Sequence, residues 1–145
     1  MVEAKFVNAK EFDAAIEKWA KKTVPWKFDQ GMVKIVTDIV TETIALTPVS
    51  DTPDNSGRLR GGWDLDIDRF DTEENGRRDE NGGTTEANAL SKLTAARRAS
   101  GSLIGKTIYF FNNVFYAVYV EFGTPKMAPF AMLRTALSKV TASLS

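Results

Sequence analysis

Apolar residues recur at helical spacing in two stretches of the first third of the chain. An Asn-x-x-Glu capping box at Asn8 opens the first stretch. Its apolar positions are Phe12, Ala15, Ile16, Trp19 and Ala20. The second stretch covers about residues 26–46, with a broader stripe of Phe28, Met32, Ile35, Val36, Ile39, Val40 and Leu46. Pro25 interrupts the first helix and suits the first turn of the second. The second helix is expected to end at Thr47–Pro48. We expect both helices to supply core.

Alternation of apolar and polar residues predicts strands elsewhere. Trp63–Phe70 alternates strictly, so one of its faces is expected in water. Lys106–Asn112 is a second strand with apolar residues on both faces, and Val2–Val7 is a further short candidate. Residues 115–122 are apolar and fit either a helix or a strand.

A last helix is expected from Pro129 onward. Its apolar stripe comprises Phe130, Leu133, Leu137, Val140 and Leu144. Residues 86–99 form an inserted helix with few apolar side chains, so we expect it to pack weakly and to stop at Gly101.

Two polar segments separate these elements. Residues 47–62 have the composition of a loop, and residues 71–85 contain no apolar side chain. We expect flexibility at about 50–56 and 71–85 in the free subunit. The chain as a whole, residues 1–145, is expected to be a single α+β domain. Its helices pack on a small, mainly antiparallel β-sheet of three or four strands, with a long flexible loop and an inserted helix.

Composition narrows the chemistry. Lys plus Arg and Asp plus Glu both number 19, so the formal net charge is zero, which argues against nucleic acid as the main partner and makes self-association easier. The chain has neither cysteine nor histidine, so thiolate catalysis, disulfides and the commonest general base are missing. No apolar stretch approaches the roughly 18 residues of a membrane span. We expect synthesis in the cytosol and no membrane partner.

Three groups of residues could in principle form a metal, phosphate or catalytic site. Asp64, Asp66 and Asp68 lack the glycine and glutamate of a calcium loop, which favours a solvated strand face over a divalent site. The stretch 57–62 lacks the spacing of a phosphate-binding loop. An extended segment is favoured there, with Arg58 and Arg60 pointing away from the core, toward a neighbouring subunit or an internal carboxylate.

Glu121 is the only acid in an apolar context and is favoured as an ion-pair anchor over a perturbed acid. We expect no catalytic residue, no cofactor and no metal.

Two segments together resemble a known family. The first is Thr47-Pro48-Val49 followed by Ser56-Gly57-Arg58-Leu59-Arg60-Gly61-Gly62-Trp63. The second contains Asn112-Asn113, Tyr116-Ala117-x-Tyr119-Val120-Glu121-Phe122-Gly123-Thr124 and Met127-Ala128-Pro129-Phe130. Order and approximate spacing are similar to those of the tail-completion and neck (head–tail joining) proteins of long-tailed bacteriophages. This chain departs from that pattern by inserting Ser50–Asn55 and a long excursion over 71–105.

The resemblance implies a structural virion protein of the head–tail junction. Such a subunit forms a ring that connects the portal side of the head to the tail tube. Its partners are copies of itself and other neck, portal-side and tail-tube or tail-terminator proteins, and genome DNA passes the channel without sequence-specific binding. The resemblance implies these candidates for the subunit interface: Gly57, Arg58, Leu59, Arg60, Tyr116, Tyr119, Glu121, Gly123, Thr124, Pro129 and Phe130. The alternative is that these residues only stabilise the fold of the monomer.

Three rival functions stay open. One keeps the phage assignment but makes the protein the tail terminator that caps the tail tube. A nucleic-acid-binding module would use Arg58, Arg60, Arg77, Arg78, Arg97 and Arg98. A hydrolase would act through Asp64, Asp66 and Glu121.

Overall fold

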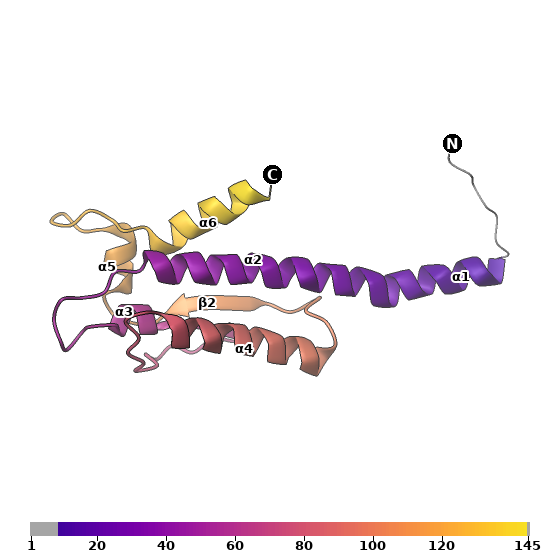
Figure 1. Ribbon diagram of the computed structural model, residues 1–145, viewed down its shortest axis with the longest axis horizontal. Coiled ribbons are helices and arrows are strands. Elements are labelled where there is room, and N and C mark those ends of the chain that lie inside the picture. Colours follow the sequence, from indigo (N-terminus) through magenta and orange to yellow (C-terminus); the bar gives the residue numbers. More distant parts are fainter. Residues whose placement is uncertain (1–8, 145) are drawn as a thin grey trace.

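A long helical rod organises the computed structural model, which describes residues 9–144 (Figure 1). The rod comprises helix α1 (Ala9–Lys18), a π-helical turn η1 (Trp19–Thr23) and helix α2 (Val24–Leu46). The candidate strand Val2–Val7 and the capping residue Asn8 lie outside the described residues. No helix within 9–144 combines the length and apolar character needed to cross a membrane.

Pro25 lies in the first turn of α2, as predicted, but the rod continues through it. The π-helical turn explains how. A proline inside a regular α-helix removes one hydrogen bond and crowds the carbonyl four residues before it. Here the Val24 N–H donates to the carbonyl of Trp19, five residues back, so the turn is widened just ahead of the proline ring. The predicted break is therefore a local change of helix type.

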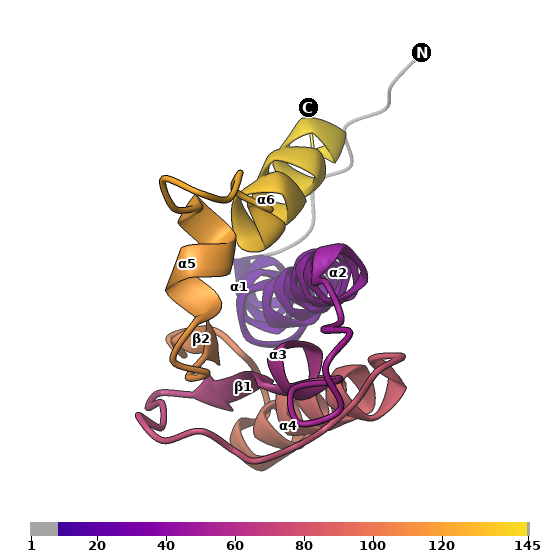
Figure 2. The same ribbon diagram turned by 90° about the vertical axis from the view of Figure 1, so that its left-hand side faces the viewer.

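Helix α2 lies between two layers (Figure 2). On one side are helix α4 (Gly83–Ser100) and strands β1 (Trp63–Ile67) and β2 (Ile108–Asn112). On the other is helix α6 (Met132–Ser143). Two short helices, α3 (Arg58–Gly61) and α5 (Ala117–Phe122), join these parts. The fold is α+β, as predicted.

The sheet is smaller than predicted. Strands β1 and β2 pair antiparallel, with Trp63 opposite Asn112 and Ile67 opposite Ile108. The expected three or four strands are wrong for the described part, because the ambiguous segment after β2 turns into helix α5. Tyr109 and Phe111 on the outer face of β2 are covered instead by Phe70, whose ring lies 4.9 Å from that of Tyr109 and 5.9 Å from that of Phe111.

The core fills the space between α2, the sheet and α6. Trp63 stacks on Phe110 at 4.8 Å between ring centroids. Its indole Nε1–H donates to Thr47 Oγ1 at 2.8 Å, so the one polar atom of the ring is satisfied inside the core. The buried apolar residues are Val36, Val40, Ile44, Leu59, Trp63, Leu65, Ala89, Leu93, Leu103, Val114, Ala117, Met132, Ala136 and Val140.

Helix α1 supplies none of this core, so the prediction that both N-terminal helices are buried is wrong for the first one. It has no buried residue, and Phe12, Ile16 and Trp19 are 56%, 49% and 58% exposed. The reason is geometric: α1 extends past the end of α4 and the sheet (Figure 1), so the body offers nothing to cover its apolar side. The residues 9–23 are called the arm from here on.

The stripe predicted for the last helix is also displaced. Helix α6 begins at Met132, after Ala131 in a left-handed conformation (φ 46°), and not at Pro129. The residues buried against α2 are Met132, Ala136 and Val140, four apart, while Leu137 and Leu144 are exposed. The small Ala136 side chain permits close approach of the two helices.

Helix α4 ends at Gly101 as predicted, in a left-handed conformation, and it buries Ala89 and Leu93 fully. Its start is fixed by Asp79 of the preceding polar segment. The carboxylate accepts the N–H groups of Gly82 (3.0 Å) and Thr85 (2.8 Å) and the Thr85 hydroxyl (2.8 Å). Segment 71–85 thus carries specific polar contacts, and its mobility in the free subunit stays a prediction.

The Asp79 contacts predict acid sensitivity. Burial disfavours the charged carboxylate, but the hydrogen bonds from Thr85 and Gly82 outweigh it and hold the pKa of Asp79 below its ordinary value. A lowered pKa in the folded state means stability that is present above the unfolded-state pKa of about 3.9 and is lost as pH falls below it.

We expect the Asp79→Asn variant to be less stable than wild type by about 2 kcal/mol at pH 7. The difference should shrink as the pH falls below the unfolded-state pKa of about 3.9, and it should vanish only below the lowered folded-state pKa, where the wild-type carboxyl is protonated in both states. Urea unfolding followed by circular dichroism at several pH values measures it. A difference that does not change with pH would contradict the assignment.

Candidate subunit-contact surface

The two sequence segments that carry the resemblance meet in space at one end of the molecule. They line a cavity of about 170 Å³. From the first segment come Pro48, Val49, Ser50 and Leu59, and from the second come Tyr116, Val120, Met127 and Phe130. The lining is largely apolar. This cavity is called the motif pocket below.

Arg58 has its partner inside the chain. Its guanidinium makes a bidentate pair with Glu74, with Nε–Oε1 at 2.6 Å and Nη2–Oε2 at 2.7 Å. The guanidinium also lies over the rings of Phe115 and Tyr116 at 5.3 and 5.7 Å from their centroids. The hydrogen bond from Arg58 holds the pKa of Glu74 below its ordinary value, against the opposing effect of burial. Arg58 therefore ties segment 71–85 to α5.

The neighbours of Arg58 also belong to the framework. The expected extended segment is wrong, because Arg58–Gly61 forms the helical turn α3 after Gly57 at φ +70°. Leu59 on this turn is buried in the core. Arg60 donates to two backbone carbonyls, that of Thr47 (2.6 and 3.1 Å) and that of Glu80 (2.5 Å). The arginine thereby joins the end of α2 to the polar segment.

Glu121 is the anchor that the sequence favoured. Only 9% exposed, its carboxylate accepts the N–H groups of Leu133 (3.0 Å) and Arg134 (3.1 Å) at the start of α6. Unpaired N–H groups at a helix N-terminus favour such a negative charge. The Arg134 side chain completes the contact, with its Nε 3.2 Å from Glu121 Oε1 and its Nη2 2.7 Å from the Glu121 carbonyl. Glu121 therefore joins α5 to α6.

The turn after α5 needs its glycine. Gly123 has φ +80°, and a Cβ there would lie 2.8 Å from the Met127 carbonyl oxygen and from the Pro129 nitrogen. Thr124 then pairs with Met127 through two backbone hydrogen bonds (2.8 and 3.2 Å). Beyond the exposed Pro129, the Phe130 N–H donates to the Val120 carbonyl at 2.9 Å. The turn is thus folded back along α5.

The aromatic side chains of the second segment stay exposed. Phe115 is 71%, Tyr119 55%, Phe122 60% and Phe130 49% exposed. Val118 (53%) and Met127 (37%) continue the same region. These six residues are called the α5 face below. A cluster of large exposed apolar side chains bordered by polar residues is typical of a protein–protein contact site.

Tyr116 links this face to the charged pair beneath it. Its ring makes an edge-to-face contact with Phe115 at 5.1 Å. Its hydroxyl is buried and has no hydrogen-bond partner among the described residues. Burial raises the pKa of Tyr116, against the opposing charge of Arg58, so the phenol is neutral at physiological pH.

The constellations weighed for catalysis are not brought together. Asp64 pairs with Lys92 (2.8 Å), and Asp68 with Lys106 (3.2 Å) and with the Thr107 N–H (2.9 Å). Asp66 accepts the N–H of Ile67 at 3.0 Å. Within residues 9–144 no group of three acidic side chains is arranged to hold a metal ion. Asp64 and Asp66 thus lie on β1 with Asp68 directly after it, and Asp64 and Asp68 are ion-paired.

The six arginines of the nucleic-acid alternative do not gather on one free face of the described chain. Besides Arg58 and Arg60, Arg77 donates to the carbonyls of Gly61 (3.3 Å) and Trp63 (3.2 Å). Arg97 lies 3.3 Å from the buried Asp29. Of the six, Arg78 and Arg98 are exposed and the other four are partly buried.

Sequence reasoning missed the groups that hold this end together. Glu74, Thr47 and Asp79 lie in segments that look like unstructured loops, and their partners are 16, 13 and 6 residues away in the chain. No local motif signals such distant pairs. Asp29, buried under α4 and bonded to Ser102 (2.9 Å) and to the Leu103 N–H (2.8 Å), was likewise hidden within an amphipathic helix.

Comparison of the chain with protein-family models, with curated proteins and with solved structures found no match.

Proposed function

We propose that this protein is a structural subunit of the neck of a long-tailed bacteriophage. As a head–tail joining or tail-completion protein, it forms a ring between the portal side of the head and the tail tube. Its neighbours are other neck, portal-side and tail proteins, and its place is the virion. The tail terminator is the nearest alternative within the same assembly.

One observation carries the proposal. Two segments about 60 residues apart, which resemble neck proteins, both line the motif pocket, and the second also carries the exposed side chains of the α5 face. Glycine turns and internal ion pairs hold these segments in place within the subunit. The aromatic side chains that the segments carry stay exposed. Rigid support under an exposed aromatic face is what a subunit contact requires.

The structure changes which residues we assign to the contact. Arg58, Arg60 and Glu121 have intramolecular partners, so we assign them to the framework of the subunit. Tyr119 and Phe130 keep the role implied by the resemblance, and Phe115, Val118, Phe122 and Met127 join them. Because the contact is made by apolar area, its loss should affect assembly more than folding.

A matched pair of substitutions tests this assignment. Val118 and Ile104 are exposed to similar extents, 53% and 48%, but only Val118 lies on the α5 face. We expect Val118→Asp to abolish ring formation at concentrations where wild type assembles, because a charge would be buried in the contact. Ile104→Asp should assemble as wild type does. Both variants should keep the wild-type circular dichroism spectrum.

The measurement is light scattering of the pure protein across concentration, with negative-stain imaging. Rings formed alone, or upon addition of isolated tails or portal complexes, are the expected result. A protein that stays monomeric in all three conditions would contradict the proposal, as would equal loss of assembly in the two variants.

A further inference from the structure

We propose that the arm of one subunit packs its apolar stripe, Phe12, Ile16 and Trp19, on the motif pocket and α5 face of a second copy of this chain. The inference rests on the proposed function, because it names the two surfaces through which the ring would close. It assigns a role to the apolar stripe of the arm, which the body leaves uncovered.

The arm is built to bind something. Its three large apolar residues are spaced four and three apart, which places them on one side of the helix. Each is about half exposed, and α1 buries no residue at all. An exposed stripe of Phe, Ile and Trp is costly in water and is a sign of a contact made elsewhere.

The arm cannot reach the motif pocket of its own subunit. The pocket begins at Pro48, directly after the rod, and the arm lies at the rod's other end (Figure 1). Residues 9–46 in helical form span about 57 Å at 1.5 Å per residue. A rigid rod of this length keeps the apolar stripe of the arm and the motif pocket at opposite ends of the subunit. A contact between them must therefore join two copies. Repeated head-to-tail contacts of this kind close into rings.

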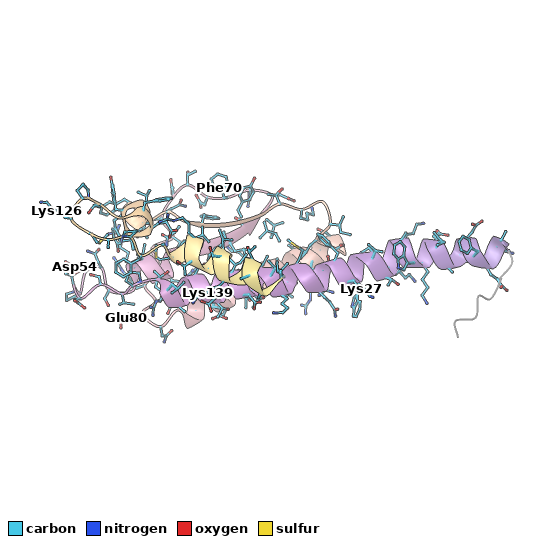
Figure 3. All side chains as sticks on the ribbon, turned by 90° about the horizontal axis from the view of Figure 1, so that it is seen from above. Lys27, Asp54, Phe70, Glu80, Lys126 and Lys139 are labelled. Atoms are coloured by element: carbon cyan, nitrogen blue, oxygen red, sulfur yellow. The ribbon has the colours of Figure 1, made fainter. Side chains whose placement is uncertain are left out.

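Charge supports the same pairing. Residues 18–27 of the rod carry Lys18, Lys21, Lys22 and Lys27 and no acid, and of these lysines Lys21 pairs with Glu17 of the preceding turn at 2.5 Å. The loop 50–56, which runs from the lip of the motif pocket, carries the exposed Asp51 and Asp54 and no base. Figure 3 shows Asp54 and Lys27 toward opposite ends of the molecule, as a head-to-tail contact requires. Opposite charge at the rim would set the register of the apolar contact.

Other occupants fit less well. Two arms packed on each other would form a coiled coil of only about two heptads, below the three to four that a stable one needs. A basic helix with Trp and Phe could also lie on an anionic membrane. That mode would leave the motif pocket and α5 face without a role.

Cross-linking of full-length chains separates these modes. The chain has no cysteine, so each introduced thiol is unique. We would mix an Ile16→Cys variant, isotope-labelled, with an unlabelled Val49→Cys variant and add a short bis-maleimide reagent. The expected product is a mixed dimer joined through positions 16 and 49, identified by mass spectrometry. The control pairs Ile16→Cys with Ser91→Cys, an exposed position on α4, and should give at least tenfold less product.

A second variant tests the apolar stripe directly. Adding Trp19→Asp to the Ile16→Cys chain should lower the mixed product at least tenfold without loss of folding, since Trp19 is exposed in the subunit. Products joined through two copies of position 16 would overturn the inference in favour of arm–arm pairing. Binding of wild type to anionic phosphatidylserine vesicles, with no 16–49 product, would overturn it in favour of a membrane.

The two proposals fail differently. Rings seen in the microscope without the 16–49 product would overturn this inference and leave the proposed function standing. The 16–49 product in open chains that never close, even beside tails or portals, would support the arm contact and contradict the ring.

Discussion

Alanine in place of Gly57 is expected to lower the free energy of unfolding by at least about 2 kcal/mol. Gly57 has φ +70°, where an L side chain is strained by about 1–2 kcal/mol. A Cβ there would also lie 2.8 Å from the backbone nitrogens of Asp79 and Glu80. These are main-chain atoms, so the clash must be relieved by moving the polar segment that caps α4. The loss of stability should therefore exceed the strain of the left-handed backbone conformation alone.

Gly76 is the matched control for Gly57→Ala. Its φ is +73°, nearly the same, but a Cβ there meets no atom within 4 Å. Gly76→Ala should cost only the strain of a left-handed backbone conformation, about 1–2 kcal/mol. Chemical denaturation of the two variants and wild type gives both values. Equal losses would mean that the close approach of the polar segment to Gly57 does not hold in solution.

Truncation of Glu121 to alanine is the second large effect, with an expected loss of about 3 kcal/mol. It removes a buried carboxylate that accepts two N–H groups at the start of α6, and hydrogen bonds to a charged group contribute about 1.5–3 kcal/mol. Arg134 loses its partner at the same time. Glu121→Gln keeps an acceptor oxygen without the charge and should lose about half as much.

Glu42→Ala serves as the comparison for Glu121→Ala. Glu42 pairs with Lys139 at 3.2 Å, and both side chains are at least 40% exposed. Such a pair contributes at most about 1 kcal/mol. The measurement is again denaturant unfolding. A Glu121→Ala variant that is as stable as wild type but fails to assemble would move Glu121 from the framework to the contact surface.

The sequence predicted those parts of the fold that depend on local periodicity. Strands β1 and β2, helix α2 and the stop at Gly101 follow from side chains within a few residues of each other. The anchoring role of Glu121 also follows from its apolar neighbours. Its partners at the start of α6 do not, because they are 12 and 13 residues away.

Errors arose where one pattern fits two environments. An apolar stripe such as Phe12, Ile16 and Trp19 has the same spacing whether it packs in the core of its own subunit or contacts another subunit. Residues 115–122 are too short and too uniformly apolar to distinguish a helix from a strand. The left-handed Ala131, which precedes the start of α6 at Met132, has no signature in the sequence.

The π-helical turn has a consequence for how such an arm could be aimed. A π turn holds one residue more than an α turn over the same length. If the five residues of η1 adopted regular α-helix with none deleted, everything before them would rotate by about 100° around the rod axis, while α2 and the body stay in place. The azimuth of Phe12, Ile16 and Trp19 is therefore an adjustable property, set by a five-residue segment that touches no part of the core.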